Sequence, residues 1–240
     1  MASIAALCKR KGWAFFYITK TLSTTLKQNL SGNLKAALDN GMELLEVKHD
    51  EYRDVVRSLY TPLPDTRIDY KDNDLLLAQG GADLGAKEGI LVLVKEIALW
   101  QQKSKIKKLT VVTPSGTGTT AFFLAHALAD ATVVTTPLIG SKVYLLEQMQ
   151  SLGEIPKNLT ILETEKKYHF GKCYDEYLDV YKEMMNQGIV IDLLYAPKML
   201  IALREKFGLI EGDVLYVHSG GVQGNHSMLE RYTNKGLNIH

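Results

Sequence analysis

The sequence predicts an α/β protein with a mainly parallel sheet. Segments rich in β-branched and aromatic residues alternate with segments of helical periodicity along most of the chain, as in strands that are joined by crossover helices. The 240 residues suffice for one large domain or two small ones. Apolar residues make up 46% of the chain and charged residues 23%, the proportions of an ordinary globular protein.

The first sixty residues predict helices and strands in alternation. Ile4, Leu7 and Cys8 have helical spacing and Gly12 is a typical helix stop, so a helix is expected over 2–10. This helix begins at or near Met1, without a capping box or a preceding loop to satisfy its first N–H groups. The further elements expected here are strands at 13–19 and 43–48, a helix that ends near Leu38, and a short helix at 51–60.

Residues 61–73 carry closely spaced prolines and many polar side chains, and they are the best candidate for a domain crossing. We therefore expect residues 1–62 to be part of a small α/β domain and residues 63–240 to form a larger one. Strands are predicted in the larger domain at 75–79, 108–114, 131–138, 159–164, 189–194 and 214–221. Helices are predicted between them at 90–102, 120–129, 142–152, 174–187 and 197–208.

Composition argues against several classes of partner. The formal charge of +1 provides no basic field for nucleic acid. No apolar run reaches the roughly 20 residues that a membrane span needs. Cys8 and Cys173 have no CxxC partner and the histidines show no zinc spacing, so no metal is expected. Two lone thiols fit the reducing cytoplasm.

One turn has the composition of a phosphate-binding loop. Residues 115–120, SGTGTT, lie between the strand at 108–114 and the helix that follows. Glycines let backbone N–H groups converge, and the start of a helix adds its positive end. The turn is neither a Walker loop nor a complete GxGxxG fingerprint. A tight turn that only caps the helix is the alternative.

Other predicted strand ends carry small or polar residues as well. Residues 80–86 (GGADLGA) follow one strand, Tyr195 follows another, and Ser219 and Gly220 end the last one. Each alone is typical of a plain turn. Because ligands of open α/β sheets bind beyond the carboxyl ends of the strands, these segments together predict one shared site.

The histidines are less informative. His126 lies within an apolar helical segment and is expected to be packed in the core. His218 alternates with Ser219 along a strand and is expected to support that strand. His226 is expected in an exposed turn, and His169 lies in a loop that could close over a ligand.

Four segments together resemble a known enzyme family. They are LTVVTPSGTGTTAFFLAHAL, LLLAQGGADLGAKEGI, IDLLYAPKMLIAL and VLYVHSGGVQGNH. Their order and approximate spacing are similar to those of the pyridoxal-phosphate (PLP) enzymes called 1-aminocyclopropane-1-carboxylate deaminase/D-cysteine desulfhydrase. The resemblance covers almost the whole chain. It implies a three-layer αβα architecture with mainly parallel sheets, the tryptophan-synthase-β-like fold (fold type II of PLP enzymes).

The resemblance also implies roles for individual residues. Tyr195 would lie against the cofactor and carry a proton, and Ser219, beside Gly220, would meet the pyridine nitrogen. The family often has Thr at the position of Ser219; either hydroxyl leaves the ring a weaker electron sink than a carboxylate would, which suits deamination or β-elimination. The phosphate of PLP would be held in the larger, cofactor-binding domain by Ser115, Gly116, Thr117, Gly118, Thr119 and Thr120.

The chain departs from the family at its start. Family members carry a Schiff-base lysine in a GNK segment near the N-terminus, followed by a QSN stretch, whereas this chain begins with MASIAALCKRKGW, which resembles the helix after that stretch. We therefore expect an N-terminally truncated chain without this lysine, whose own activity is open. Lys35, Lys172 and Lys198 are the weaker alternatives for the lysine.

Three functions follow from these patterns. The first is a PLP-dependent deaminase or desulfhydrase for a small amino acid, 1-aminocyclopropane-1-carboxylate or one similar to D-cysteine. The second is a non-catalytic module that binds a phosphate ligand or a partner on the same scaffold. The third, a Rossmann dehydrogenase, is disfavoured because the third glycine is missing and no acidic residue ends the strand at 131–138. The family often dimerises, which leaves a homodimer open.

Overall fold

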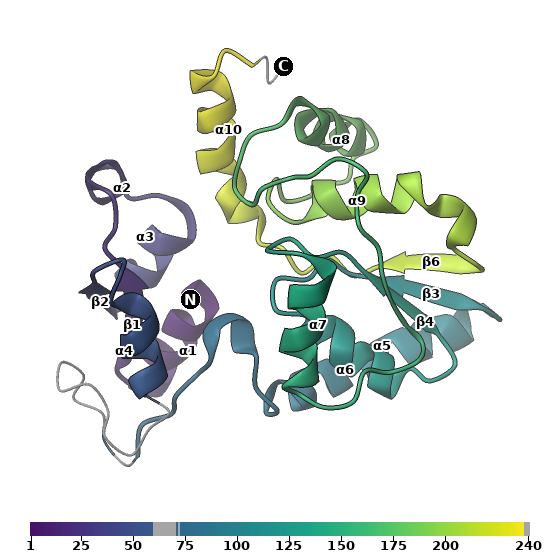
Figure 1. Ribbon diagram of the computed structural model, residues 1–240, viewed down its shortest axis with the longest axis horizontal. Coiled ribbons are helices and arrows are strands. Elements are labelled where there is room, and N and C mark those ends of the chain that lie inside the picture. Colours follow the sequence, from purple (N-terminus) through teal and green to yellow (C-terminus); the bar gives the residue numbers. More distant parts are fainter. Residues whose placement is uncertain (60–70, 72, 238–240) are drawn as a thin grey trace. The chain divides into compact units, whose positions relative to one another are not determined.

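The chain divides into two units in the computed structural model, Met1–Leu76 and Leu77–His240 (Figure 1). The structure describes residues 1–59, 71 and 73–237. The domain boundary expected between residues 62 and 63 lies outside the described residues.

The first unit contains a two-stranded parallel sheet covered by short helices. Its strands pair in register from Phe15 with Met42 to Lys20 with Val47. Ala5, Leu34, Ala37 and Met42 form its buried core. The elements are α1 (Ala2–Lys11), β1 (Phe15–Lys20), α2 (Thr24–Gln28), α3 (Gly32–Asp39), β2 (Met42–Val47) and α4 (Tyr52–Ser58). The predicted helices and strands of this region are confirmed, and α2 was not predicted.

The second unit is built on a four-stranded parallel sheet in the order β5-β4-β3-β6. Its strands are β3 (Leu109–Val112), β4 (Thr132–Thr135), β5 (Leu159–Ile161) and β6 (Asp213–Tyr216). Its α-helices are α5 (Ala86–Lys103), α6 (Thr119–Ala127), α7 (Lys142–Gln150), α8 (Asp175–Asn186), α9 (Ala196–Glu205) and α10 (Asn225–Asn234). Short 3-10 helices occupy Gln79–Gly81, Phe207–Leu209 and Val222–Gly224.

Helices cover both faces of this sheet. Val111 and Val133 face a core formed with α5, α6 and α7, whereas Val112 and Val134 face α9 through Met199. Successive strand residues thus bury opposite faces, which is why these strands read as continuous apolar runs. The second unit has the predicted three-layer αβα arrangement with parallel strands (Figure 1).

Two predicted strands are absent. Residues 75–78 have no regular structure, and Leu75 is 79% exposed, so its apolar side chain has no sheet to cover. Residues 189–195 are irregular because side chains take their backbone groups: Asn225 Oδ1 accepts from Leu193 N–H at 2.9 Å, and Asp192 accepts from the N–H groups that follow it. A segment whose N–H groups are bonded to side chains cannot use them in a ladder. Helix α10 was not predicted, although Met228 and Tyr232 have helical spacing.

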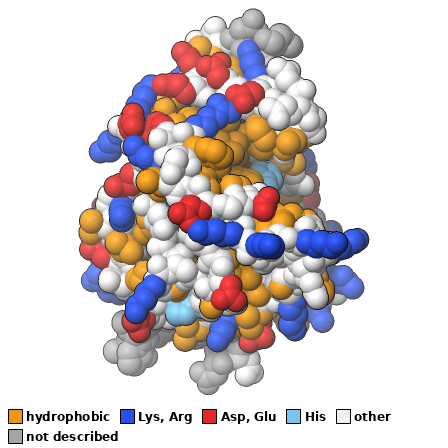
Figure 2. Space-filling model, turned by 90° about the vertical axis from the view of Figure 1, so that its right-hand side faces the viewer, with side chains coloured by type: hydrophobic (Ala, Val, Ile, Leu, Met, Phe, Trp, Pro, Cys, Tyr) orange, Lys and Arg blue, Asp and Glu red, His pale blue; other side chains and the backbone are white. Residues whose placement is uncertain are grey.

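Charges of both signs are interspersed over the face of the molecule drawn in Figure 2. Figure 2 shows lysine, arginine, aspartate and glutamate side chains with apolar side chains between them. This distribution agrees with the formal net charge of +1. Within the part of the chain that the structure describes, every helix is too short or too polar to cross a membrane.

Candidate functional site

Loops that follow the strands of the second unit meet at one edge of the sheet. Hydrogen bonding continues past the strands there: Thr113 N–H donates to Val134 O at 3.0 Å, and Val217 N–H donates to Val112 O at 2.8 Å. Because all four strands are parallel, their carboxyl ends lie at the same edge, where ligands of open α/β sheets bind.

The start of the SGTGTT loop is anchored in the sheet. Ser115 N–H donates to Thr136 O at 3.1 Å, and Ser115 O accepts from Leu138 N–H at 2.9 Å. The Ser115 hydroxyl is buried and lies 2.6 Å from the hydroxyl of Thr135. Ser115 therefore holds the loop in place, with its hydroxyl already bonded inside the protein.

The middle of the loop requires glycine. Gly118 has a φ of 84°, and a Cβ atom at this position would lie 2.5 Å from Met149 Cε. The turn at 79–81 lies against the loop, since a Cβ atom on Gly80 would lie 2.6 Å from Thr117 Cγ2. The predicted meeting of 80–86 with residues 115–120 is therefore present, although no strand precedes 80–86.

The start of α6 offers free donors. Its first internal hydrogen bond runs from Phe122 N–H to Gly118 O at 2.9 Å. Among the described residues, no group accepts from the N–H groups of Thr119, Thr120 or Ala121. The hydroxyls of Thr117 and Thr119 lie 3.0 Å apart beside them. A glycine turn with three free N–H groups at the positive end of a helix fits a phosphate group.

Tyr195 lies at the N-cap position of α9 and is half-buried. Phe170 packs edge-on against its ring at a centroid distance of 5.5 Å. Burial, and secondarily the charge of Asp192, raises the pKa of the Tyr195 phenol above its usual value. The phenol is therefore protonated near neutral pH and is able to donate a proton.

Ser219 and Gly220 follow β6 at the same edge. Ser219 is exposed. Gly220 packs against Asp192 so closely that a Cβ atom at this position would overlap the carboxylate. The last predicted segment is thus joined to the segment before Tyr195 through a residue that sequence reasoning missed.

Asp192 is the missed residue. Its carboxylate is 2% exposed and accepts hydrogen bonds from backbone N–H groups at the start of α9. The signal is present in the sequence: an aspartate before a helix whose first turn contains Pro197 is a typical N-terminal pattern. The apolar residues around Asp192 predict a strand instead, and a strand has no helix cap within it.

The histidines agree with the sequence only in part. The expectation that His126 packs in the core is wrong, because its helix reaches the surface in its last turn, where the ring is exposed and Nε2 lies 3.0 Å from Glu154 O. His218 Nε2 lies 3.1 Å from Asp192 Oδ2. His226 is exposed as expected and 3.2 Å from Glu230, but it lies in the first turn of α10 and not in a loop. His169 is exposed in the loop before α8.

The three alternative lysines have different environments. Lys35 is exposed in the first unit and bonded to Asp39 at 2.7 Å. Lys172 is exposed. Lys198 is buried, its Nζ donates to Pro137 O at 2.6 Å, and burial lowers its pKa below the usual value for lysine.

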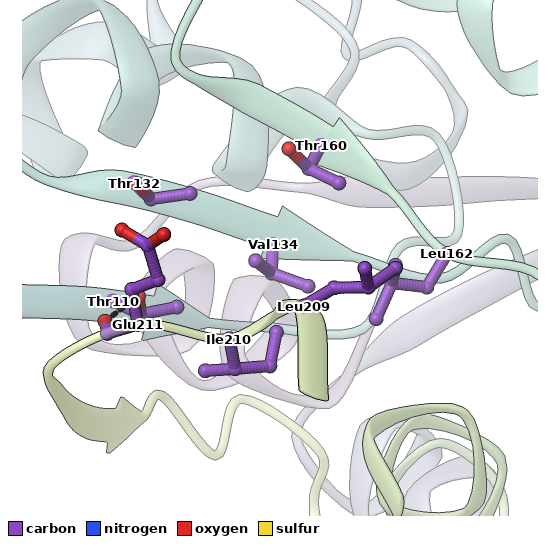
Figure 3. Close-up of a pocket in the computed structure, with 8 residues that line it drawn as sticks. All are labelled: Thr110, Thr132, Val134, Thr160, Leu162, Leu209, Ile210 and Glu211. Atoms are coloured by element: carbon purple, nitrogen blue, oxygen red, sulfur yellow. Dashed lines mark hydrogen bonds between the residues drawn. The ribbon is translucent and has the colours of Figure 1, made fainter. Parts of the chain in front are cut away.

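A small hollow lies elsewhere on the sheet (Figure 3). It has a volume of about 70 Å³, well below the roughly 300–1,000 Å³ of ordinary small-molecule sites. Thr110 donates to the backbone oxygen of Glu211 at 2.8 Å at one side of it. The lining residues are Thr110, Thr132, Val134, Thr160, Leu162, Leu209, Ile210 and Glu211. The hollow is too small for PLP and includes none of the loop residues 115–120.

Comparisons with known proteins agree with this fold. No family model matches the chain. A putative 1-aminocyclopropane-1-carboxylate deaminase of Thermotoga maritima is 25% identical over 211 residues, which cover 81% of this chain and 66% of the relative. The chain therefore spans slightly less than two thirds of the length of this curated relative.

Solved structures share the fold at low identity. A hydrogen sulfide-producing enzyme from Fusobacterium nucleatum is 13% identical with a TM-score of 0.65, covering 96% of this chain and 70% of that one. A threonine deaminase from T.th. is 13% identical with a TM-score of 0.57, covering 92% and 73%. An O-ureido-L-serine synthase is 13% identical with a TM-score of 0.52, covering 90% and 67%.

These likenesses define the class of protein first. The fold is the tryptophan-synthase-β-like fold, fold type II of PLP enzymes, as the sequence implied. Within that class, the similarity to the putative Thermotoga maritima deaminase confirms the resemblance to the deaminase/desulfhydrase family that the four sequence segments indicated.

Proposed function

We propose that the chain binds PLP at the carboxyl edge of its larger sheet and belongs to a deaminase or desulfhydrase that acts on a small amino acid. The observation that carries the proposal is the glycine turn at 115–118, which leads into a helix start with three free N–H groups. The names of the relatives support the reaction class, since they include a putative 1-aminocyclopropane-1-carboxylate deaminase, a threonine deaminase and a hydrogen sulfide-producing enzyme.

Each site residue has a role in this proposal. Bound PLP supplies an electron sink for the carbanion of the amino acid. The N–H groups of Thr119 and Thr120 bind its phosphate, with the hydroxyls of Thr117 and Thr119 beside them. Ser219 offers a neutral hydroxyl to the pyridine nitrogen. Tyr195 is protonated near neutral pH. Its phenol donates a proton to the substrate carbon or relays a proton to that carbon.

Titration with PLP tests the binding part of the proposal. We expect saturable binding, followed by the absorbance of the cofactor, with competition by inorganic phosphate because the phosphate loop provides the main contacts. Turnover of 1-aminocyclopropane-1-carboxylate and D-cysteine is then measured by 2-oxoacid formation and, for D-cysteine, by sulfide release. Absence of PLP binding in the wild-type chain contradicts the proposal.

Substitution of Tyr195 tests the chemical part. In a preparation that turns over substrate, Tyr195→Phe removes the proton donor and keeps the ring that packs on Phe170. The expected loss in kcat is about 10²-fold, the usual size for general acid–base catalysis. Phe170→Leu is a control that removes the ring contact and keeps the phenol. A kcat that is unchanged in Tyr195→Phe reduces Tyr195 to a packing residue.

The second candidate is a non-catalytic module that binds a phosphate ligand. The environments of the three alternative Schiff-base lysines favour it. Lys35 and Lys172 are exposed, and the amine of Lys198 already donates to Pro137 O. Reduction of the PLP complex with borohydride, followed by mass spectrometry, separates the two candidates. One stoichiometric lysine adduct supports the enzyme, whereas PLP binding without a specific adduct supports the module.

A homodimer in the cytoplasm completes the proposal. Helix α5 exposes apolar side chains that a second copy would cover, with Val92 57%, Leu99 66% and Trp100 40% exposed. Size-exclusion chromatography with light scattering gives the mass of the particle, and Leu99→Glu is expected to shift a dimer toward the monomer. Cys8 and Cys173 are buried free thiols, which suits a reducing compartment.

A further inference from the structure

We propose that Asp192 is the positioning residue of this site, because its carboxylate holds the Tyr195 backbone and the His218–Gly220 segment after β6 in one arrangement. The roles of Tyr195 and Ser219 rest on the proposed function. The contacts of Asp192 do not depend on it.

One side of Asp192 holds the start of α9. Its Oδ1 accepts from Leu194 N–H at 2.9 Å and from Tyr195 N–H at 2.5 Å, and its Oδ2 accepts from Ala196 N–H at 3.3 Å. Hydrogen bonds from backbone N–H groups to a carboxylate are charge-assisted and are stronger than neutral ones. This carboxylate therefore sets the backbone position of Tyr195, from which the phenol side chain extends.

The other side of Asp192 holds the segment that follows β6. Oδ2 lies 3.1 Å from His218 Nε2, and Gly220 packs directly against the carboxylate. Ser219 lies between these two residues in the chain. Its hydroxyl, the group expected to face the pyridine nitrogen, is therefore placed by two neighbours that both contact Asp192.

His218 contacts Asp192 in either neutral tautomer. Its Nε2 also lies 3.1 Å from the backbone N of Asp192. When Nε2 carries a hydrogen it donates to Oδ2, and when it is bare it accepts from the N–H group. The segment after β6 remains joined to Asp192 in both states.

The surrounding segment gives Asp192 this importance. Residues 189–195 have no strand neighbour, so side chains replace the ladder bonds. Asn225 holds the segment from one side, accepting from Leu193 N–H at 2.9 Å and donating to Ile191 O at 2.8 Å. Asp192 is the part of this arrangement that reaches both Tyr195 and the turn around Ser219. It acts through these residues.

Asp192→Asn tests the inference, with Asp213→Asn as the matched control. Asp213 is exposed at the first residue of β6, at the opposite end of the strand. In the ligand-free chain, hydrogen exchange at the amides of residues 194–196 is expected to be faster by about tenfold or more in Asp192→Asn, as loss of a charge-assisted hydrogen bond implies. Asp213→Asn is expected to leave this exchange unchanged.

The PLP complex provides a second readout. The ³¹P signal and the affinity report on the phosphate loop, and we expect both to be nearly unchanged in Asp192→Asn. The visible circular dichroism of the bound ring reports its orientation, and we expect it to fall by at least half. If the carboxylate only stabilised the fold, Asp192→Asn would lower the melting temperature and would not selectively change the circular dichroism of the bound ring.

Several outcomes overturn the inference. Unchanged exchange at residues 194–196 in Asp192→Asn shows that the carboxylate does not hold this backbone. Faster amide exchange with unchanged circular dichroism of the bound ring shows that Asp192 fixes the backbone but does not influence the orientation of the cofactor. Failure of the proposed function is distinguishable, because the wild-type chain then binds no PLP, and the exchange measurement alone decides whether Asp192 positions Tyr195.

Discussion

Gly118 is a residue whose substitution directly tests the proposed phosphate binding by the loop at 115–120. Its φ of 84° is disfavoured for other residues, and a Cβ atom would lie 2.5 Å from Met149 Cε. Gly118→Ala is therefore expected to cost about 1–3 kcal/mol of unfolding free energy and to weaken PLP binding, because the turn is displaced.

Gly208→Ala, in the 3-10 helix Phe207–Leu209 outside the loop, is the matched control for this prediction. A Cβ atom on Gly208 has no heavy atom within 4 Å, so this variant is expected to keep both stability and affinity. Urea denaturation and PLP titration measure the two effects. Equal behaviour of the two alanine variants would show that the loop tolerates a side chain at position 118.

Lys198 gives a prediction about pH. Burial lowers its pKa in the folded chain, whereas in the unfolded chain the pKa is near its ordinary value of 10.5. The unfolded chain then binds more protons just below pH 10.5, so the unfolding free energy rises with pH in that window. Lys198→Met should lack this contribution, while Lys157→Met, at an exposed position, should keep it.

Urea denaturation of these variants at several values between about pH 9 and 10.5 measures the slope, and the tyrosines contribute equally to every variant. The difference between the wild-type and Lys198→Met slopes isolates the buried amine. An identical slope in both proteins would mean that the Lys198 ammonium is as well solvated in the folded chain as in the unfolded chain.

At the scale of elements, the two ends of α6 have opposite roles. The N-terminal end has N–H groups without an acceptor, which the proposed function assigns to a phosphate group. Beyond the C-terminal end, Asn158 Nδ2 lies within hydrogen-bond distance of Ala125 O, Leu128 O and Ala131 O, at 3.0, 3.0 and 2.8 Å. This single amide holds the connection between α6 and β4.

Asn158→Ala removes this amide and leaves carbonyl groups without their donor. We expect a loss of about 1–3 kcal/mol in unfolding free energy, the usual cost of unsatisfied buried polar groups. Asn186→Ala, at the exposed end of α8, is the control and should change stability little. Chemical denaturation measures both, and equal stabilities would contradict the role of Asn158.

At the scale of the whole molecule, the candidate site belongs to one unit. Residues 79–81, the loop at 115–120, Asp192, Tyr195 and Ser219 all lie within Leu77–His240. The cores on both faces of the four-stranded sheet lie there too. We therefore expect residues 77–240, expressed alone, to fold and to bind PLP with about the affinity of the full chain.

Circular dichroism and PLP titration of the 77–240 fragment test this expectation. The full chain is the reference, and Gly118→Ala in the fragment should again weaken binding. A folded fragment that has lost PLP affinity would show that residues of the first unit contribute to the site.

Local patterns in the sequence predicted most of the elements. The strands at 108–114 and 131–138 were recognisable because both faces are buried and most residues are apolar or β-branched. The strand at 159–164 was recognisable from its β-branched residues, although Thr160 is exposed. The loop at 115–120 was recognisable because glycine and hydroxyl residues follow a strand and precede a helix. The four segments that resemble the deaminase/desulfhydrase family added the fold, which the solved structures confirm.

The sequence by itself thus determined the α/β class, the glycine turn between strand and helix at 115–120 and the resemblance, since each depends on neighbouring residues or on segments in order. Only the tertiary structure decided the form of residues 189–195. Their apolar character predicts a strand, but side chains distant in the sequence, such as Asn225, take their backbone groups. The same holds for Asp192, whose meeting with His218 and Gly220 depends on the packing of α9 beside β6. Hydrogen bonds between distant residues leave no periodic pattern in the sequence, so tertiary packing alone reveals them.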